Sequence, residues 1–272
     1  MDELSPYRFV ELEDLRAYMN RPGVGEDAAL VAAINASTAA LELRTGGRKL
    51  RERLYLEPVV VACSSITGAA VVGTGFSALL AGTDVVAPGL KVGTRILSIQ
   101  SNTGMTLDKT AATNTSTPVS MTCGRGGIWL DGDGSRFIVV PEFPVTTLYG
   151  AKYRDPRDAT RTSLDVTNAR IDAEAGIIEL AADYTPSGVG NLLVECKAGY
   201  RKSTGQAFGH DSEWEWLARL QTRMCEVLFS DEKLHVGRMS DVSLSGQSVR
   251  LASMELPADI EEGLAHFRRV PL

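Results

Sequence analysis

The sequence is poor in the residues from which most catalytic and metal-binding sites are built. It has only three histidines, and its four cysteines form no C-x-x-C pair. It also lacks an H-x-x-x-H pair, a G-x-S-x-G nucleophile elbow and a G-x-x-x-x-G-K-[ST] phosphate loop. A hydrolase built on its scattered His and Asp residues has no constellation to support it. We therefore expect no catalytic residue, no metal and no cofactor. The histidines and cysteines are His210, His235, His266, Cys63, Cys123, Cys196 and Cys225.

Positive charge and aromatic side chains are also scarce. The net charge is -6, the pI is about 5.2 and aromatics make up 6% of the chain. This composition argues against a surface that neutralises phosphates and against a base-stacking platform. No apolar run reaches the roughly 20 residues that a bilayer requires. The start of the chain, Met1–Phe9, is acidic and lacks the apolar segment of a secretory signal. We expect no membrane partner, and reduced, mostly buried thiols.

What the chain has is length and helical periodicity. At 272 residues it predicts about two domains. Apolar spacing predicts helices near 12–19 and over 26–45, the latter ending at Gly46-Gly47. A third helix follows a capping box at Ser212 and Glu215 and is apolar on more than one face. Such a helix lies either deep in a core or also against another subunit. A short final helix follows Leu256-Pro257, and 236–253 predicts a hairpin or extended arm.

Residues 59–124 have a different composition from the rest. These 66 positions hold five charges and eleven threonines, and glycines divide them into short runs. Alternation is clear at Val119, Met121 and Cys123, and Thr and Val favour strands. The pattern predicts a small all-β, sandwich-like module inserted into the chain.

Residues 125–199 predict several short strands. Asp131–Gly134 is a hairpin signal, and Asp172–Gly176 predicts a turn across which 177–180 pairs back. Asp131, Asp133, Ser135 and Glu142 also match ligand positions of a calcium loop. Arg136 stands where that loop needs glycine, so a solvated turn is the simpler interpretation.

Two further groups allow two interpretations each. Arg48, Lys49, Arg51 and Arg53 form a basic cluster that either contacts nucleic acid or an acidic partner, or stabilises a helix end and an outward strand face. Trp214 and Trp216 are either ligand-stacking residues or anchors of a core and an interface, and a capped helix favours the second interpretation.

Several segments, taken in order, resemble the head–tail connector (adaptor) proteins of long-tailed bacteriophages. They lie within the opening helices, 130–145, 176–180, 190–200 and Leu256-Pro257, and together cover about three quarters of the chain. They include Leu130-Asp-Gly-Asp-Gly, Val140-Pro-Glu-Phe-Pro-Val145 and Ala198-Gly199-Tyr200. The insertion at 59–124 departs from the family's pattern.

The resemblance implies an α+β fold: a helical adaptor core with a small β-sheet and hairpin region, plus the inserted module. The domains would be a discontinuous core (1–58 and 124–272), the module (59–123) and a portal-docking segment (255–272). The chain would form a ring, usually of twelve subunits, below the portal in the virion neck, after assembly in the host cytoplasm. The ring would extend the channel for genomic DNA, without sequence-specific contact, and would offer a platform for a tail-completion, stopper or tail-terminator protein. The alternative is a β-sandwich protein that binds a ligand or glycan through 59–124.

Two sets of residues follow as candidates. Helices with apolar faces suit the heterologous contacts of a closed ring, and the family's last segment docks on the portal. The ring-interface candidates are Leu30, Ile34, Leu41, Trp214, Trp216, Leu220 and Met224. The portal-docking candidates are Ile260, Leu264, Phe267, Arg268, Arg269 and Leu272.

Overall fold

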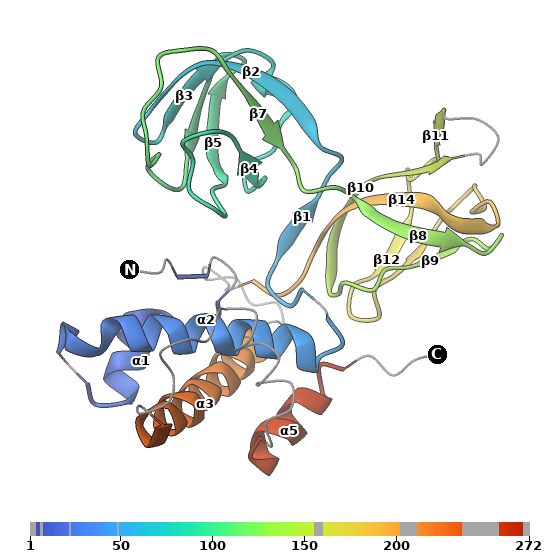
Figure 1. The fold of residues 1–272 in the computed structure, drawn as a ribbon. Helices are drawn as coiled ribbons and strands as arrows, with labels where there is room; N and C mark the ends of the chain where they lie inside the picture. Colours follow the sequence, from blue (N-terminus) through green and yellow to red (C-terminus); the bar gives the residue numbers. More distant parts are fainter. Residues whose placement is uncertain are drawn as a thin grey trace. The chain divides into compact units, whose positions relative to one another are not determined.

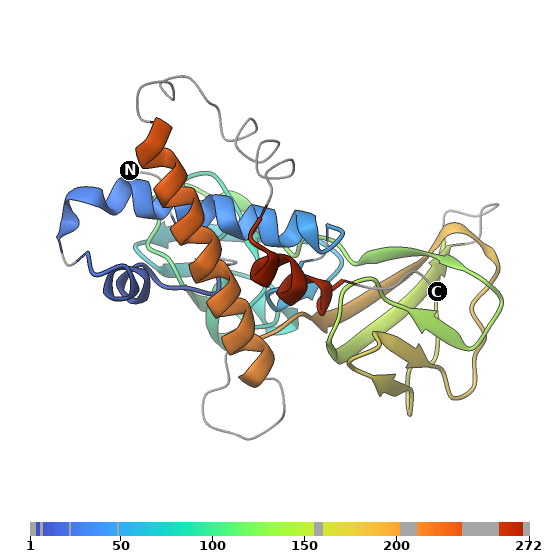
Figure 2. The same cartoon turned by 90° about the horizontal axis from the view of Figure 1, so that it is seen from below.

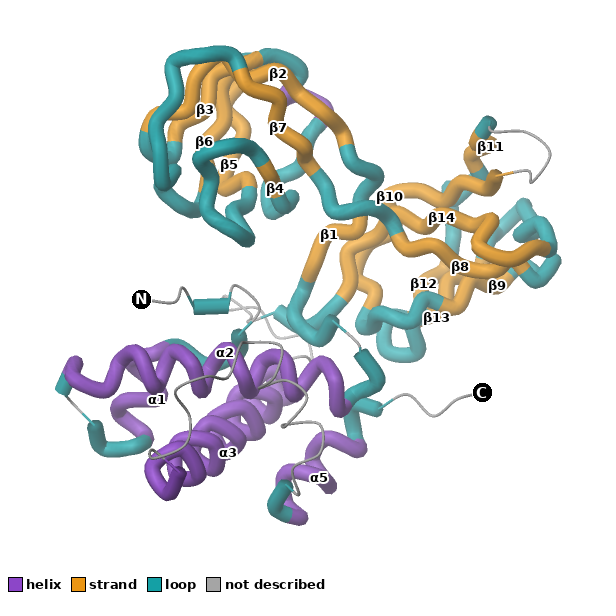
Figure 3. Tube along the Cα trace, in the orientation of Figure 1, coloured by secondary structure: helices purple, strands orange, loops and turns teal. Residues whose placement is uncertain are grey.

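The computed structural model describes residues 4–5, 8–21, 23–47, 49–154, 160–201, 211–235 and 256–268. Within 211–235, which form a helix, it describes the side chains of residues 213–229. The chain folds as two units (Figure 1). The helical unit joins Met1–Arg51 to Tyr200–Leu272, and the β unit is Glu52–Gly199. Every α-helix described lies in the first unit and every named strand in the second (Figure 3).

The expected α+β class with a helical adaptor core is wrong. The described residues form fourteen strands in three sheets and only four α-helices, so the fold is mostly β. The expectation treated the strands after residue 124 as an accessory of the helices. Instead they enclose an apolar core of their own, which includes Ile138, Ile178 and Val194. A segment that buries its own core needs no helical layer for its stability.

The helical unit contains α1 (Leu12–Tyr18), the 3-10 turn η1 (Val24–Glu26), α2 (Asp27–Arg44), α3 (Asp211–His235) and α5 (Ala258–Ala265). The prediction of a helix over 26–45 is confirmed, as is the final helix. Gly46 and Gly47 follow α2 with φ of 85° and 81°, which glycine adopts without strain. Figure 2 shows α3 crossing α2 with α5 alongside. No helix among the described residues is long and apolar enough to span a bilayer.

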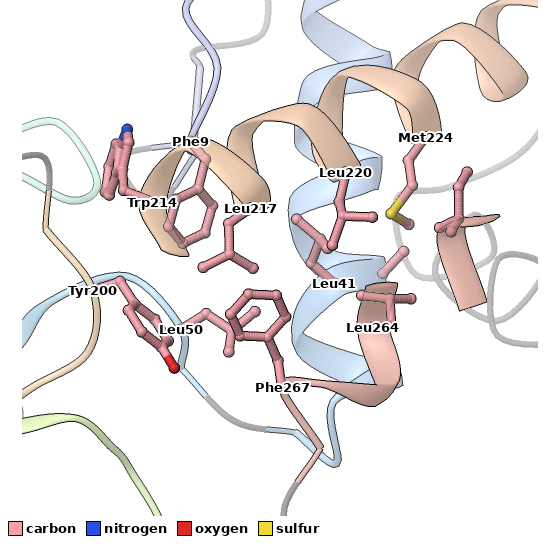
Figure 4. Close-up of a cluster of buried hydrophobic side chains, with 12 residues drawn as sticks. Phe9, Leu41, Leu50, Tyr200, Trp214, Leu217, Leu220, Met224, Leu264 and Phe267 are labelled. Atoms are coloured by element: carbon pink, nitrogen blue, oxygen red, sulfur yellow. The ribbon is translucent and has the colours of Figure 1, made fainter. Parts of the chain in front are cut away.

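The two apolar faces of α3 are both covered within this chain. One buried cluster joins Leu217 and Leu220 to Leu41 of α2 and to Leu264 of α5 (Figure 4). A second joins Cys225 and Phe229 of α3 to α1 and to the first half of α2. Burying an aliphatic or aromatic side chain contributes about 1.5–3 kcal/mol, so these contacts hold the four helices together. The side chain of Ser212, which would form the predicted capping box, and the 236–253 arm are not among the parts of the chain that the structure describes.

The β unit contains a five-stranded sheet and a three-stranded sheet around one core. The first has the order β1 (Arg53–Tyr55), β14 (Gly188–Ala198), β10 (Val145–Arg154) and β11 (Arg161–Ser163), with β8 (Ile128–Gly132) also on β14. The second has the order β12 (Arg170–Asp172), β13 (Ile177–Glu179) and β9 (Phe137–Val139). The predicted pairing across Asp172–Gly176 is confirmed. The hairpin predicted at Asp131–Gly134 is wrong, because β8 pairs with β14 and β9 with β13.

Residues 59–123 form a third sheet with a separate core. Its order is β4 (Val85–Val86), β7 (Val119–Cys123), β2 (Val59–Thr67), β3 (Ala70–Gly73), β6 (Gly104–Leu107) and β5 (Ile96–Ser101). One antiparallel sheet curls on itself (Figure 1), where a sandwich-like module was expected. Its buried apolar residues, among them Ile66, Met105 and Met121, form one cluster. The 3-10 turn η2 (Phe76–Ala78) places Phe76, fully buried, in that core. A Cβ on Gly73 would lie 2.7 Å from the Phe76 ring, so only glycine allows this packing.

Candidate functional site

The most crowded group of charges in the described residues lies in the β unit. Strands β10 and β14 pair antiparallel, with Lys152 opposite Leu193. The Lys152 ammonium lies 3.0 Å from a Glu57 oxygen and 2.9 Å from a Glu195 oxygen. Arg161 of β11 forms an ion pair with Glu57. We call Glu57, Lys152, Arg161 and Glu195 the Glu57 cluster.

The Glu57 cluster holds the chain at residue 57 and leaves no group poised for chemistry. The Glu57 backbone N–H donates to a Glu195 carboxylate oxygen at 2.9 Å. The Arg161 guanidinium also lies 5.5 Å from the centre of the Trp129 ring, a cation–π contact. Each of the four charged side chains is therefore paired with another, and two negative charges balance two positive ones. Such a group fixes the position of a segment, and its partners come from four separate strands or loops.

The calcium-loop residues are used in the turn itself. A carboxylate oxygen of Asp133 accepts hydrogen bonds from the Ser135 N–H at 2.8 Å and from the Thr185 hydroxyl at 3.1 Å. These bonds, those from Ser135 first, lower the pKa of Asp133. Asp131 accepts from the Gly190 N–H at 2.6 Å. The described residues hold no group of three or more His, Cys, Asp or Glu that could bind a metal. The sequence predicted a solvated hairpin turn here, but the segment is no hairpin, and both aspartates accept hydrogen bonds from within the chain.

The cysteines are buried and free, as predicted. Burial raises the pKa of the Cys123, Cys196 and Cys225 thiols to about 12, and it also raises the pKa of Cys63. A thiol needs its thiolate form to act as a nucleophile, so these groups pack as small apolar side chains. Of the histidines, His266 stacks on Trp216 with ring centroids 6.0 Å apart. His210 lies outside the described residues, as does the side chain of His235.

Six of the seven ring-interface candidates are buried inside this chain. Their exposed fractions do not exceed 8%, whereas Trp216 keeps 50% of its surface. Packing among the four helices and the N-terminal segment at Phe9 therefore accounts for their apolar character. Trp216 is the member of the set with substantial surface for a neighbouring molecule. The six buried candidates are Leu30, Ile34, Leu41, Trp214, Leu220 and Met224.

A buried polar residue that the sequence analysis overlooked lies between these helices. Gln221 is fully buried, on the face of α3 that packs on α2. Its amide nitrogen donates to the Thr38 hydroxyl at 2.7 Å and to the Ser37 hydroxyl at 3.2 Å. The visible signal was a Gln at a position that helical periodicity assigns to the core. Because a buried amide must find partners, that position could have been predicted to hold a hydrogen-bond network.

The portal-docking candidates fall into two groups. Ile260, Leu264 and Phe267 are buried against the helical unit, with exposed fractions of 0%, 0% and 1%. Arg268 is exposed and donates from Nε to the Arg44 carbonyl at 2.8 Å, and its guanidinium lies 2.8 Å from a Glu261 oxygen. Arg44 lies 2.5 Å from the other Glu261 oxygen. Arg269 and Leu272 lie outside the described residues.

The basic cluster near residue 50 is engaged within the chain. Lys49 lies 2.6 Å from a Glu42 carboxylate oxygen. Arg51 donates to the Arg8 carbonyl at 2.5 Å and stacks over Trp214 at 5.4 Å. Arg53 is 7% exposed, and Arg48 lies outside the described residues. These contacts favour a structural role over contact with nucleic acid or an acidic partner, although the buried Arg53 does not lie on an outward strand face.

One surface groove in the helical unit lies between α1 and α3. Its volume is about 400 Å³, and its walls mix apolar and charged side chains. Phe9, Val10 and Ala218 give the apolar part, and Arg219 and Arg223 contribute positive charge. The groove is open and carries no cluster of catalytic groups among the described residues.

Three of the segments that carry the resemblance to head–tail connectors, 130–145, 176–180 and 190–200, meet in the β unit, whereas the opening helices and Leu256-Pro257 belong to the helical unit. Val140 and Val145, Ile178 and Leu180, and Leu192 and Val194 are all buried in the core between the two sheets. After Ala198 the chain leaves β14 and enters the helical unit at Tyr200. The Tyr200 ring packs edge-on against Phe267 with centroids 5.6 Å apart. These three segments therefore build one core and the exit from it.

Comparisons with known proteins give one distant similarity to report. No protein-family model matches the chain, and no curated protein matches it. A solved chain from the "Neck of empty GTA particle computed with C6 symmetry" is 14% identical. The match covers 100% of this chain and 96% of that chain, with a TM-score of 0.44. A similarity of this size supports neither a fold assignment nor a functional one.

Proposed function

We propose that this chain is a structural protein of a virion neck, a head-to-tail adaptor that forms a ring below the portal. The observation that carries the proposal is the convergence of three connector-like segments, 130–145, 176–180 and 190–200, in one β core. Segments that meet in a core are constrained together by packing. The proposal includes no catalytic activity, no metal and no cofactor.

The charges of the described residues support a structural role. The basic side chains near residue 50 and those of the Glu57 cluster have partners within the chain. The chain as a whole carries a net charge of -6. An acidic ring around a channel forms few phosphate contacts, so genomic DNA slides through it without being gripped. The ring extends the DNA channel and offers a platform to a tail-completion, stopper or tail-terminator protein, in the neck of particles assembled in the host cytoplasm.

The subunit contact needs exposed apolar surface, because the buried faces of α2 and α3 are already used. Trp216 is the ring-interface candidate that keeps it. We expect purified protein, alone or with portal protein, to form closed rings, twelve-fold in the simplest case. Negative-stain electron microscopy with class averaging measures this. Trp216→Lys should reduce ring formation, whereas Tyr184→Lys, at a 62% exposed site of the β unit, should not.

The portal contact is tested by truncation, and the length of the truncation matters. Removing 255–272 would also uncover Leu217 and Leu220, because α5 covers them. Removing only 268–272 leaves the buried stripe of α5 in place. If the short truncation still folds and joins portal-containing particles, Arg268 and the residues after it do not dock on the portal. If full-length protein stays monomeric and does not bind portal, the adaptor role itself is contradicted.

A further inference from the structure

The two segments that connect residues 59–123 to the rest of the β unit run side by side. The Gly126 N–H donates to the Leu56 carbonyl at 3.0 Å. A Cβ on Gly124 would lie 3.0 Å from the Leu56 oxygen and 3.1 Å from the Glu57 oxygen, so glycine is needed for this approach. Gly124 and Gly126 have φ of 99° and 110°, in the region that glycine tolerates. The connection is a two-stranded neck of residues 56–58 and 124–126.

One end of this neck is fixed to the five-stranded sheet. Glu57 is held by the Glu57 cluster, through its backbone N–H and its carboxylate. On the other segment, Gly127 is wedged against β14. A Cβ there would lie 2.6 Å from a Leu193 methyl carbon and 2.8 Å from the Val194 oxygen. Both segments are therefore anchored at residues 57 and 127.

The other end of the neck is fixed to the module of residues 59–123 by Asp84. This residue is 5% exposed, and its carboxylate lies 3.2 Å from Arg95 Nε and 2.8 Å from Arg125 Nε. Its backbone carbonyl accepts from the Gly124 N–H at 2.9 Å. Val59 pairs with Cys123 at the start of the sheet. Arg125 is thus tied back to the module, although it stands beyond the last strand of that sheet.

Between these two anchors stand Pro58 and Gly126. Pro58 is exposed, and a Cβ on Gly126 would meet nothing within 4 Å. A glycine in open space is where a chain absorbs a change of dihedral angles at least cost. Arg125 is paired on the module side of Gly126, and Gly127 is wedged on the other side.

We propose that Gly126, with the ψ angle of the exposed Pro58 on the facing segment, is the pivot of a hinge and that the Asp84–Arg125 ion pair is its lock. With the pair formed, Arg125 moves with the module, and the freedom of the neck is confined to one residue on each segment. With the pair broken, two backbone hydrogen bonds, from Gly124 to Asp84 and from Gly126 to Leu56, are what still restrain residues 124–126 in the described contacts, and the module takes a wider range of orientations. The inference concerns how the module is attached, and it does not depend on the proposed role of the protein in a virion.

The experiment measures the spread of distances between the module and the rest of the β unit. Cysteines introduced at Val92 and Arg170, which are 86% and 87% exposed, carry spin labels. The buried native thiols react slowly, and unsubstituted protein gives the labelling background. Double electron–electron resonance on full-length protein should give one narrow peak. Asp84→Asn should replace that peak by a broad distribution, and Arg125→Gln should do the same from the exposed side of the pair.

The matched control is Asp108→Asn, in the same module. Asp108 accepts a backbone bond from Arg95 at 2.7 Å, which an asparagine oxygen also accepts. It should keep the narrow peak. Hydrogen exchange separates hinge motion from unfolding: amides of β2 and β7 should stay protected in Asp84→Asn while 124–127 exchange faster. The proposal is overturned if both lock variants fold and keep the narrow peak, if unsubstituted protein is already as broad as they are, or if the module's strands lose protection.

Discussion

The side-chain oxygen of Gln221 accepts a hydrogen bond from the backbone N–H of Phe9 at 2.7 Å, across 212 residues of sequence. The same oxygen accepts from the Val10 N–H at 3.0 Å. The Gln221 amide nitrogen donates to α2, so one side chain joins the N-terminal segment, α2 and α3. Neither backbone group is paired by a helix at this point, because α1 begins at Leu12. The hydrogen bonds of Gln221 therefore fix the position of the N-terminal segment against α2 and α3.

Replacing Gln221 by leucine should destabilise the helical unit. The substitution keeps the volume but leaves two backbone donors buried without partners, at about 1–3 kcal/mol each. Urea unfolding followed by circular dichroism at the helical band measures the loss. Gln100→Leu is the control, since Gln100 lies exposed on β5 and bonds only to exposed hydroxyls in the described contacts. Equal stability of the two variants would mean that the Gln221 bonds contribute nothing net.

A second prediction concerns Gly132, at the end of β8. A Cβ there would lie 1.8 Å from the Pro186 carbonyl oxygen and 3.0 Å from the Asn191 side-chain oxygen. Backbone cannot yield as a flexible side chain does, so Gly132→Ala should force the 185–191 segment away from β8. We expect a loss of about 2–4 kcal/mol, the size of an overpacked core site.

Its control is Gly25→Ala in the helical unit, where a new Cβ meets nothing within 4 Å and φ is not positive. Thermal unfolding by differential scanning fluorimetry should show a clear drop for the first variant and almost none for the second. A Gly132→Ala protein as stable as the unsubstituted chain would show that the loop crossing relaxes at little cost.

Local sequence patterns were enough to predict helices and turns, but not to predict which strands pair with one another. The helix over 26–45 and the turn at Asp172–Gly176 follow from apolar spacing and turn chemistry, which act within a few residues. Strand partners do not follow, because pairing depends on long-range contacts. Asp131–Gly134 has the composition of a hairpin turn, yet β8 pairs with β14 some sixty residues later. Because long-range strand pairing could not be predicted, the fold class was predicted wrongly as well.

The prediction of the candidate site was limited for the same reason, because its contacts join residues far apart in the sequence. Apolar faces on α3 predicted a helix with two partners, but the sequence could not say whether these lie in the same chain. Here α1, α2 and α5 supply them. The Glu57 cluster draws on residues up to 138 positions apart, so spacing in the sequence carried no signal of it.

A third prediction concerns the seat of α5. Gly263 faces α3, and a Cβ would lie 2.5 Å from a Leu220 methyl carbon and 3.1 Å from Trp216 Nε1. Gly263→Leu should therefore lift α5 from α3, at a cost of about 1–3 kcal/mol. Hydrogen exchange of residues 258–267 should rise. Ala265→Leu, on the exposed side of the same helix, should leave that exchange unchanged. Similar exchange in both variants would indicate that the ion pairs of Glu261 with Arg44 and Arg268, rather than the packing at Gly263, hold α5 on α3.

The last prediction is a loss of stability at high pH that depends on the buried thiols. Burial raises the pKa of Cys196 from 9.0 to about 12 in the folded chain, because a buried thiolate loses its hydration. The folded state therefore binds the thiol proton more tightly than the unfolded state. This contribution is fully present below the unfolded pKa and is lost as the pH rises through the folded pKa, between pH 9 and pH 12. Cys196→Ala removes one such group.

We expect the urea midpoint of the unsubstituted protein to fall more steeply between about pH 8 and about pH 10.5 than that of Cys196→Ala. The variant starts from a lower midpoint, because alanine leaves a small cavity in the core of the β unit. The comparison therefore rests on the two slopes. Parallel slopes would show that folding does not raise the pKa of Cys196, contrary to what its complete burial predicts.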